Sequence, residues 1–271
     1  MYDGGMEFSM LVILGILAGT LGGLLGIGGS VIMIPALLFF IPDVSIHLAQ
    51  AIAMSVNPAV AIAAAAKHNR NMNVSWHAVW RVIPLSLFFI SAAAWFSNSL
   101  DGALLEFCFA LFLTWVFWDQ ITSFMNKPLN HKPEQKVDSK PTTNVRYGIT
   151  GGITGIFSGI LGIGGGLIQV PLLNRVCSLP IKHAIGTSSA IMFVTAIVGA
   201  TVKDLSLQEM EGTGLKALIY AAQIIPGALI GGWAGAKLTN VLPSKVIRLI
   251  FAILVATASY KLFSDSIPIL F

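Results

Sequence analysis

The chain has 271 residues, of which 55% are hydrophobic and only 10% are charged, with a formal net charge of +4. Soluble globular proteins usually carry about 25% charged residues. This composition therefore excludes an ordinary soluble domain and indicates a polytopic membrane protein. Most basic residues lie in short gaps between apolar runs, a pattern that membrane topology explains better than nucleic-acid binding.

The first half of the chain contains four apolar segments. The first runs from Phe8 to Leu25, is interrupted by glycines at 26–29, and restarts at Ser30 as a piece that ends at Ile41. A membrane-spanning helix needs about 20 apolar residues, so we expect the restarted piece to be a half-helix. Three longer apolar runs follow, at 48–66, 79–96 and 103–124.

The second half repeats this plan after a polar segment at 126–144, which has three prolines and mixed charge and is typical of a solvated loop. An apolar run at 145–161 is broken by glycines at 162–166, and a half-helix is expected to end at Val176. Further runs follow at 184–202, 215–238 and 246–263, with Glu209 and Glu211 expected in a polar loop. We therefore predict a first transmembrane repeat at 1–125, a cytoplasmic linker at 126–144 and a second transmembrane repeat at 145–271.

An internal duplication supports this division. A shift of 136 residues superposes Gly15–Pro35 on Gly151–Pro171 with ten identities in 21 positions, six of them glycines. The predicted fold is an all-α polytopic membrane protein of two repeats. Each repeat is a glycine-broken helical hairpin followed by three full spans.

The distribution of charge predicts that the two repeats are inverted. If each broken stretch enters and leaves on one side, 13 of the 16 Lys and Arg residues fall on one face and nine of the 12 acids on the other. The positive-inside rule then places both termini outside and the two halves in opposite orientations.

Two inverted breaks should meet near the bilayer midplane, where repeat-built transporters bind their substrates. Each break precedes the N-terminus of a half-helix, whose unpaired amide groups and dipole attract anions. The candidate substrate-binding residues are Gly26, Gly28, Gly29, Ser30, Gly164, Gly165 and Gly166. Tight turning alone is the alternative explanation for these glycines. Gly15, Gly19 and Gly23 and their counterparts Gly151, Gly155 and Gly159 fall four apart, which favours close helix packing.

Polar side chains inside apolar runs complete the candidate set. They are Ser55, Asn57, Gln169, Thr187, Ser188 and Ser189. These residues either line the substrate path or bond only to neighbouring helices.

The ionisable residues and cysteines suggest no further chemistry. Lys203 is expected to snorkel from a span end, and no carboxylate falls at the centre of a predicted span. We therefore expect no coupling through a buried carboxylate, because an outward-moving anion gains about 2.3 kcal/mol per charge per 100 mV of inside-negative potential. Cys108 and Cys177 lie in or beside apolar runs and are expected to be buried, inert thiols.

The twin blocks GLLGIGGSVIMIP and GILGIGGGLIQVP, separated by a polar loop in an eight-run chain, resemble the TauE/SafE sulfite exporter (TSUP) family. The resemblance covers essentially the whole chain. It implies a multi-pass plasma-membrane permease for small sulfur-containing anions such as sulfite, sulfonates or sulfoacetate. The glycine blocks that mark the family correspond here to Gly26–Ser30 and Gly162–Gly166. Gly166 stands in the second block where the first has Ser30.

The sequence thus predicts a membrane transporter that moves such anions outward, with a small anionic substrate and the lipid bilayer as its partners. No cofactor, metal ion or nucleic-acid partner is expected. An anion channel that uses the same site is the nearest alternative. An intramembrane enzyme is less favoured, because the chain lacks HExxH and its five histidines fall in loops or at span ends.

Overall fold

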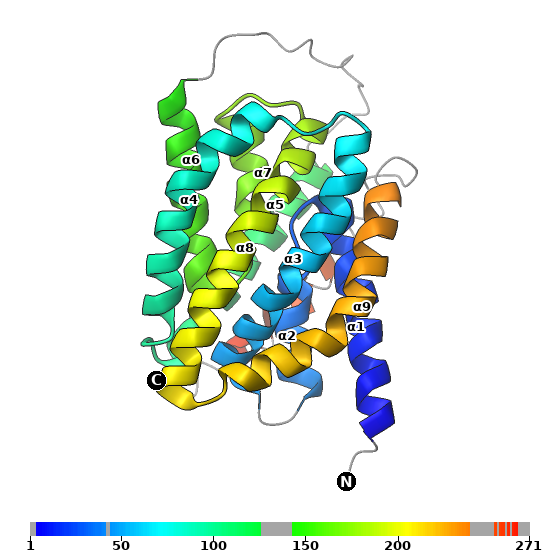
Figure 1. Ribbon diagram of the computed structural model, residues 1–271, viewed down its shortest axis with the longest axis vertical. Helices are drawn as coiled ribbons and strands as arrows, with labels where there is room; N and C mark the ends of the chain where they lie inside the picture. Colours follow the sequence, from blue (N-terminus) through cyan, green and yellow to red (C-terminus); the bar gives the residue numbers. More distant parts are fainter. Residues whose placement is uncertain are drawn as a thin grey trace.

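The computed structural model describes residues 4–41, 44–125 and 143–238, together with residues 252, 253, 255–257, 259, 260 and 262–264. Over these residues the regular structure is α-helical (Figure 1). The helices are α1 Gly4–Leu25, α2 Ser30–Phe40, α3 Ile46–Arg70, α4 Trp76–Ser97, α5 Gly102–Met125, α6 Asn144–Leu161, α7 Gly166–Arg175, α8 Ile181–Glu211 and α9 Gly214–Leu238.

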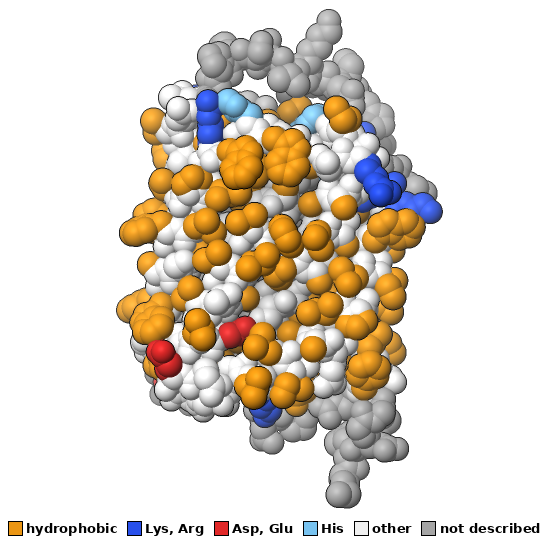
Figure 2. Space-filling model, viewed as in Figure 1, with side chains coloured by type: hydrophobic (Ala, Val, Ile, Leu, Met, Phe, Trp, Pro, Cys, Tyr) orange, Lys and Arg blue, Asp and Glu red, His pale blue; other side chains and the backbone are white. Residues whose placement is uncertain are grey.

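Five of these helices contain a segment that is long and apolar enough to cross a membrane. They are α1, α3, α4, α8 and α9. Figure 2 shows hydrophobic side chains spread over the middle of the displayed face, with most visible Lys and Arg toward the upper end and the visible acids toward the lower end. On α4, Trp80 and Phe88 are both 70% exposed. Such an extensive apolar surface fits a lipid environment and not an aqueous one. The chain is an integral membrane protein.

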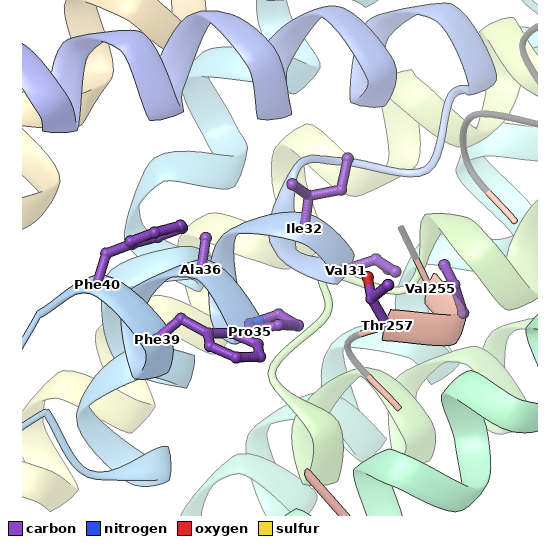
Figure 3. A pocket seen from close by; sticks show the side chains of 8 residues that line it. All are labelled: Val31, Ile32, Pro35, Ala36, Phe39, Phe40, Val255 and Thr257. Carbon is purple, nitrogen blue, oxygen red and sulfur yellow. The ribbon is translucent and has the colours of Figure 1, made fainter. Parts of the chain in front are cut away.

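The first glycine break reverses the direction of the chain. Gly26 and Gly28 have φ of +68° and +75°, which a glycine adopts at little cost. A Cβ on Gly22 of α1 would lie 2.6 Å from the carbonyl carbon of Gly28, so the chain folds directly back onto α1. Figure 3 shows α2 running back alongside α1. The predicted half-helix is confirmed and starts at Ser30.

The second break has the same construction. Gly162, Gly164 and Gly165 all have positive φ, and a Cβ on Gly165 would lie 2.6 Å from Thr154 Cγ2 of α6. The second half-helix starts at Gly166, as predicted, and has only 10 residues. Neither half-helix is long enough to span a bilayer.

The glycines spaced four apart pack helices closely, as predicted. A Cβ on Gly15, Gly19 or Gly23 of α1 would lie 2.4, 2.6 or 2.3 Å from a carbonyl oxygen of α9. Their counterparts in α6 meet α4 in the same way, since a Cβ on Gly151 would lie 2.5 Å from the Val82 oxygen. Each glycine-bearing helix therefore packs against a helix of the other half.

One predicted boundary is wrong. We expected a polar loop after Val202, but α8 continues to Glu211. The helix persists because its polar residues at 203, 204 and 206 are buried against neighbouring helices. Lys203 is 0% exposed and does not snorkel to an interface. Asp204, which lies just beyond the predicted run at 184–202, is only 8% exposed, so α8 carries a buried carboxylate that we did not predict from the sequence.

The C-terminal run predicted at 246–263 is only partly described, and its described residues are helical. The predicted linker lies outside the described residues except for 143 and 144.

Candidate functional site

Asn57 of α3 joins the first glycine break to the centre of the molecule. Its side chain is fully buried. The Nδ2 atom donates to Ser30 Oγ at 2.7 Å, and Oδ1 accepts from the Gly29 amide at 3.2 Å. Pro58 follows Asn57 inside α3 and lacks the amide that would bond to the carbonyl of the residue four positions earlier. Asn57 therefore holds the N-terminal end of α2 through both atoms of its amide.

The second break reaches the same side chain. A Cβ on Gly28 would lie 3.0 Å from Asn57 Oδ1, and a Cβ on Gly164 would lie 2.4 Å from Asn57 Nδ2. Both breaks also face Met192 of α8, whose sulfur would lie 2.9 Å and 3.5 Å from those two Cβ positions. The two breaks therefore converge on one asparagine and one methionine.

The breaks also touch each other. A Cβ on Gly166 would lie 2.6 Å from Ile27 Cα and 2.7 Å from the Gly26 oxygen. No side chain fits there, so the glycine at the start of α7 is required by this contact. Tight turning alone does not account for Gly166, because its φ is not among the positive values.

Ser188 of α8 ties the two breaks together on the other side. Its hydroxyl lies 3.1 Å from the Gly26 oxygen and 3.1 Å from Gln169 Oε1, and it can donate to either. Gln169 of α7 is 1% exposed, and its Nε2 atom has no hydrogen-bond partner among the described residues. A buried amide without a partner costs about 1–3 kcal/mol, so this donor is available for a ligand.

Gln50 of α3 is a second such residue, and we did not predict it. A Cβ on Gly162 would lie 2.6 Å from Gln50 Cβ, so this side chain packs on the second break. Gln50 is 0% exposed, and neither its Nε2 nor its Oε1 has a partner in the described part of the chain. Its sequence signal was its position seven residues before Asn57, which places both on one face of a helix.

Four predicted residues lie elsewhere. Ser55 donates to Asp204 Oδ2 at 2.7 Å. Thr187 accepts from the Ser75 amide at 2.9 Å, and Ser189 donates to the Ile185 oxygen of its own helix at 3.1 Å. Gly165 caps α7 and contacts α6, not the first break.

The chemistry of the converging breaks favours an anion. Neither α2 nor α7 has an acidic residue in its first turn, and both helix N-termini carry positive dipole ends. Side-chain amides and hydroxyls supply further donors. Among the described residues no group of three or more His, Cys, Asp or Glu could hold a metal ion.

The cavity on the outer side of α2 has a different character. It has a volume of about 240 Å³ and is lined almost entirely by apolar side chains (Figure 3). Its lining residues are Val31, Ile32, Pro35, Ala36, Phe39, Phe40, Val255 and Thr257. The described residues that line it offer an anion no charged partner.

Comparison with known proteins gives the same class of protein. YunE of Bacillus subtilis, named a probable membrane transporter protein, is 25% identical over 97% of this chain and 99% of its own length. A probable membrane transporter protein of Methanocaldococcus jannaschii, MJ0441, is 29% identical over 70% of each chain. No solved structure gives a significant match.

The MamO proteins of Paramagnetospirillum magneticum and Magnetospirillum gryphiswaldense, also named probable membrane transporter proteins, are both 25% identical to this chain. The chain spans only 44% and 46% of their lengths. The sequence profile of the family described as "Sulfite exporter TauE/SafE" matches residues 11–262. This chain therefore belongs to the TauE/SafE family of membrane transporters.

Proposed function

We propose that this protein is a plasma-membrane transporter that exports small sulfur-containing anions such as sulfite, sulfonates or sulfoacetate. The observation that carries the proposal is the convergence of the two glycine breaks on Asn57, which also bonds to the N-terminal end of α2, with the unpartnered amides of Gln50 and Gln169 beside them. Backbone amides and neutral side-chain donors suit a compact oxyanion, which they bind without a buried countercharge. The choice of sulfur-containing anions rests on the description of the family as a sulfite exporter.

The architecture that we propose is a pair of inverted repeats. A shift of 136 residues pairs α1 with α6, and the matching prolines Pro84 and Pro226 pair α4 with α9. The helix contacts follow the same pairing: α1 packs on α9, and the counterpart of α1, α6, packs on the counterpart of α9, α4. In Figure 1 the α1–α2 hairpin opens toward the lower end, whereas the α6–α7 hairpin opens toward the upper end. Opposite orientation of two such hairpins is the hallmark of inverted-repeat transporters.

Alternating access follows from the closure of this site. Asn57, Gln50 and Ser188 are all 0% exposed, so a substrate reaches them only when the halves move apart. We propose that one repeat rocks against the other around the converging breaks. A channel, in contrast, needs an open path through the same site.

Anion binding to purified protein tests the proposal first. Thermal unfolding in detergent is measured with a panel of sulfite, sulfonates, sulfoacetate, carboxylates and phosphate. We expect the sulfur oxyanions to stabilise the wild type but not Asn57→Ala, and to stabilise the control Asn69→Ala, an exposed asparagine of the same helix. If none of the anions raises the unfolding temperature, the site is wrong.

Flux in proteoliposomes separates a transporter from a channel. External unlabelled sulfite should accelerate the exit of labelled sulfite from preloaded vesicles, and the flux should saturate. Flux that rises linearly with concentration and shows no such exchange would favour the channel.

A further inference from the structure

A second polar cluster lies where α3, α8 and the C-terminal end of α4 meet. Lys203 is fully buried and donates from Nζ to Ser97 Oγ at 2.7 Å. Asp204 is 8% exposed and accepts at Oδ2 from Ser55 Oγ at 2.7 Å. Asn98 Nδ2 donates to the Lys203 carbonyl at 3.1 Å. Charged side chains within a membrane-spanning region are costly and usually functional.

The side chains of Lys203 and Asp204 bond to other partners and not to each other. Among the described residues each is bonded to a serine hydroxyl, and Asp204 Oδ1 and Asn98 Oδ1 have no hydrogen-bond partner. Because an ionised carboxylate has lone pairs to satisfy on both oxygens, the free Oδ1 of Asp204 is a vacant acceptor in a water-poor place. Such an atom is suited to receiving a proton.

The neighbouring elements bring few other charges to Asp204. Its main electrostatic partner is Lys203. Glu211, further along α8, interacts electrostatically with Lys203 and with the buried His47 of α3. Asp101, between α4 and α5, acts on His47. At the start of α9, the residue packed against Asp204 is the uncharged Gly214, where a Cβ would lie 2.2 Å from the Asp204 carbonyl oxygen.

We propose that Asp204 takes up a proton when the anion binds, so that the protein moves a proton together with its anionic substrate. The inference rests on the proposed function. With Asp204 ionised, its charge offsets that of Lys203. A proton on Oδ1 leaves the charge of Lys203 uncompensated, and the interior then attracts an anion more strongly. By linkage, a bound anion must favour the proton to the same extent.

The structure connects the two places through α3. Ser55, which bonds to Asp204, precedes Asn57 at the glycine breaks by two residues. Co-movement of one proton with a singly charged anion transfers no net charge. The membrane potential then ceases to drive transport, and export requires an anion gradient that exceeds any opposing pH gradient.

Proteoliposomes that contain a pH-sensitive dye test this coupling. Methanesulfonate is the probe, because it stays ionised and carries no proton of its own. For the wild type we expect about one proton to enter with each anion, and a valinomycin-set potential to leave the rate unchanged. Asp204→Asn should move the anion without protons and become sensitive to the potential. Glu209→Gln, which changes an exposed acid of α8, should behave as the wild type does.

Wild-type anion flux that carries no protons and follows the potential would overturn the coupling while leaving the proposed function intact. Failure of every sulfur anion in the panel to bind would overturn the proposed function instead. If Asp204→Asn does not fold, the proton coupling is tested by two other measurements, one on the wild type and one on Asp204→Glu. Infrared difference spectra of the wild type should gain a protonated-carboxyl band on anion binding, and Asp204→Glu should keep proton coupling. An unchanged carboxyl region would contradict the proposal.

Discussion

Asn57 Nδ2 donates to Ser30 Oγ at 2.7 Å, and this bond joins the middle of α3 to the first residue of the half-helix α2. Both side chains are fully buried. The Gly29 amide donates to the other atom of the same Asn57 amide. One side chain therefore positions the helix terminus that we propose as half of the anion site.

Asn57→Ala should lower both stability and anion binding. It removes two buried hydrogen bonds and leaves the Ser30 hydroxyl and the Gly29 amide without their partners. Loss of buried partners typically costs about 1–3 kcal/mol for each group. Thermal unfolding should show the loss, and sulfite stabilisation should disappear. Asn69→Ala loses only the exposed hydrogen bond from Trp76 Nε1 and should leave sulfite stabilisation unchanged. An Asn57→Ala protein that keeps wild-type sulfite affinity would remove Asn57 from the site.

Gly166→Ala should abolish transport. Its methyl group would lie 2.6 Å from Ile27 Cα and 2.7 Å from the Gly26 oxygen, and backbone atoms cannot rotate away as side chains do. The two breaks must then separate, by a few tenths of an ångström or more. Sulfite flux and protein yield are the measurements.

Gly148→Ala is the matched control on α6. There the methyl group would meet only Leu85 Cδ2, at 3.7 Å, an ordinary contact. Wild-type flux in Gly166→Ala would mean that the contact between the breaks is not needed for function.

The glycine breaks could be predicted because repetition makes a local pattern visible twice. The half-helix starts at Ser30 and Gly166 follow from glycines between two apolar runs. The grouping of Ser55 with Asn57 was less successful, and helix geometry explains why. Residues two apart are rotated by about 200°, so Asn57 faces the breaks while Ser55 faces Asp204. Likewise, of the consecutive residues Thr187, Ser188 and Ser189, only Ser188 bonds at the breaks.

Other features depended on neighbours that the sequence does not name. Lys203 and Asp204 follow an apolar run and therefore look like the start of a loop. They stay helical because α3 and the end of α4 supply Ser55 and Ser97 as partners. Gln50 was missed because it lies near the start of the predicted run at 48–66, where a polar side chain is typical of a span end. The packing of Gln50 against Gly162 places it at the second break.

Cys177, in the segment between α7 and α8, should react slowly with thiol reagents. Burial raises the pKa of its thiol above the ordinary value, and Thr150 and Arg146 only partly oppose that shift. A raised pKa keeps the thiol protonated, so the reactive thiolate appears only as pH rises beyond the usual range. Iodoacetamide modification of a Cys108→Ser protein, followed by mass spectrometry from pH 7 to 10, measures this.

Ser178→Cys in a protein whose two native cysteines are replaced by serine is the control, because Ser178 is the exposed neighbour. It should react faster and at lower pH than Cys177. Identical pH profiles for the two positions would show that burial does not protect Cys177.

Gln50→Met should raise stability while weakening anion binding. The change keeps the length of the side chain but removes two buried polar atoms that have no partner among the described residues. Relief of an unsatisfied buried amide is worth about 1–3 kcal/mol, so the unfolding temperature without anion should rise. Loss of the Nε2 donor should reduce sulfite affinity severalfold.

Gln223→Met makes the same change at a half-buried position on α9 and should leave affinity unaltered. Loss of affinity alongside the gain in stability identifies a binding residue, because a glutamine that only packs against Gly162 would leave affinity unchanged. A stability loss in Gln50→Met with unchanged affinity would therefore assign Gln50 to packing against Gly162 alone.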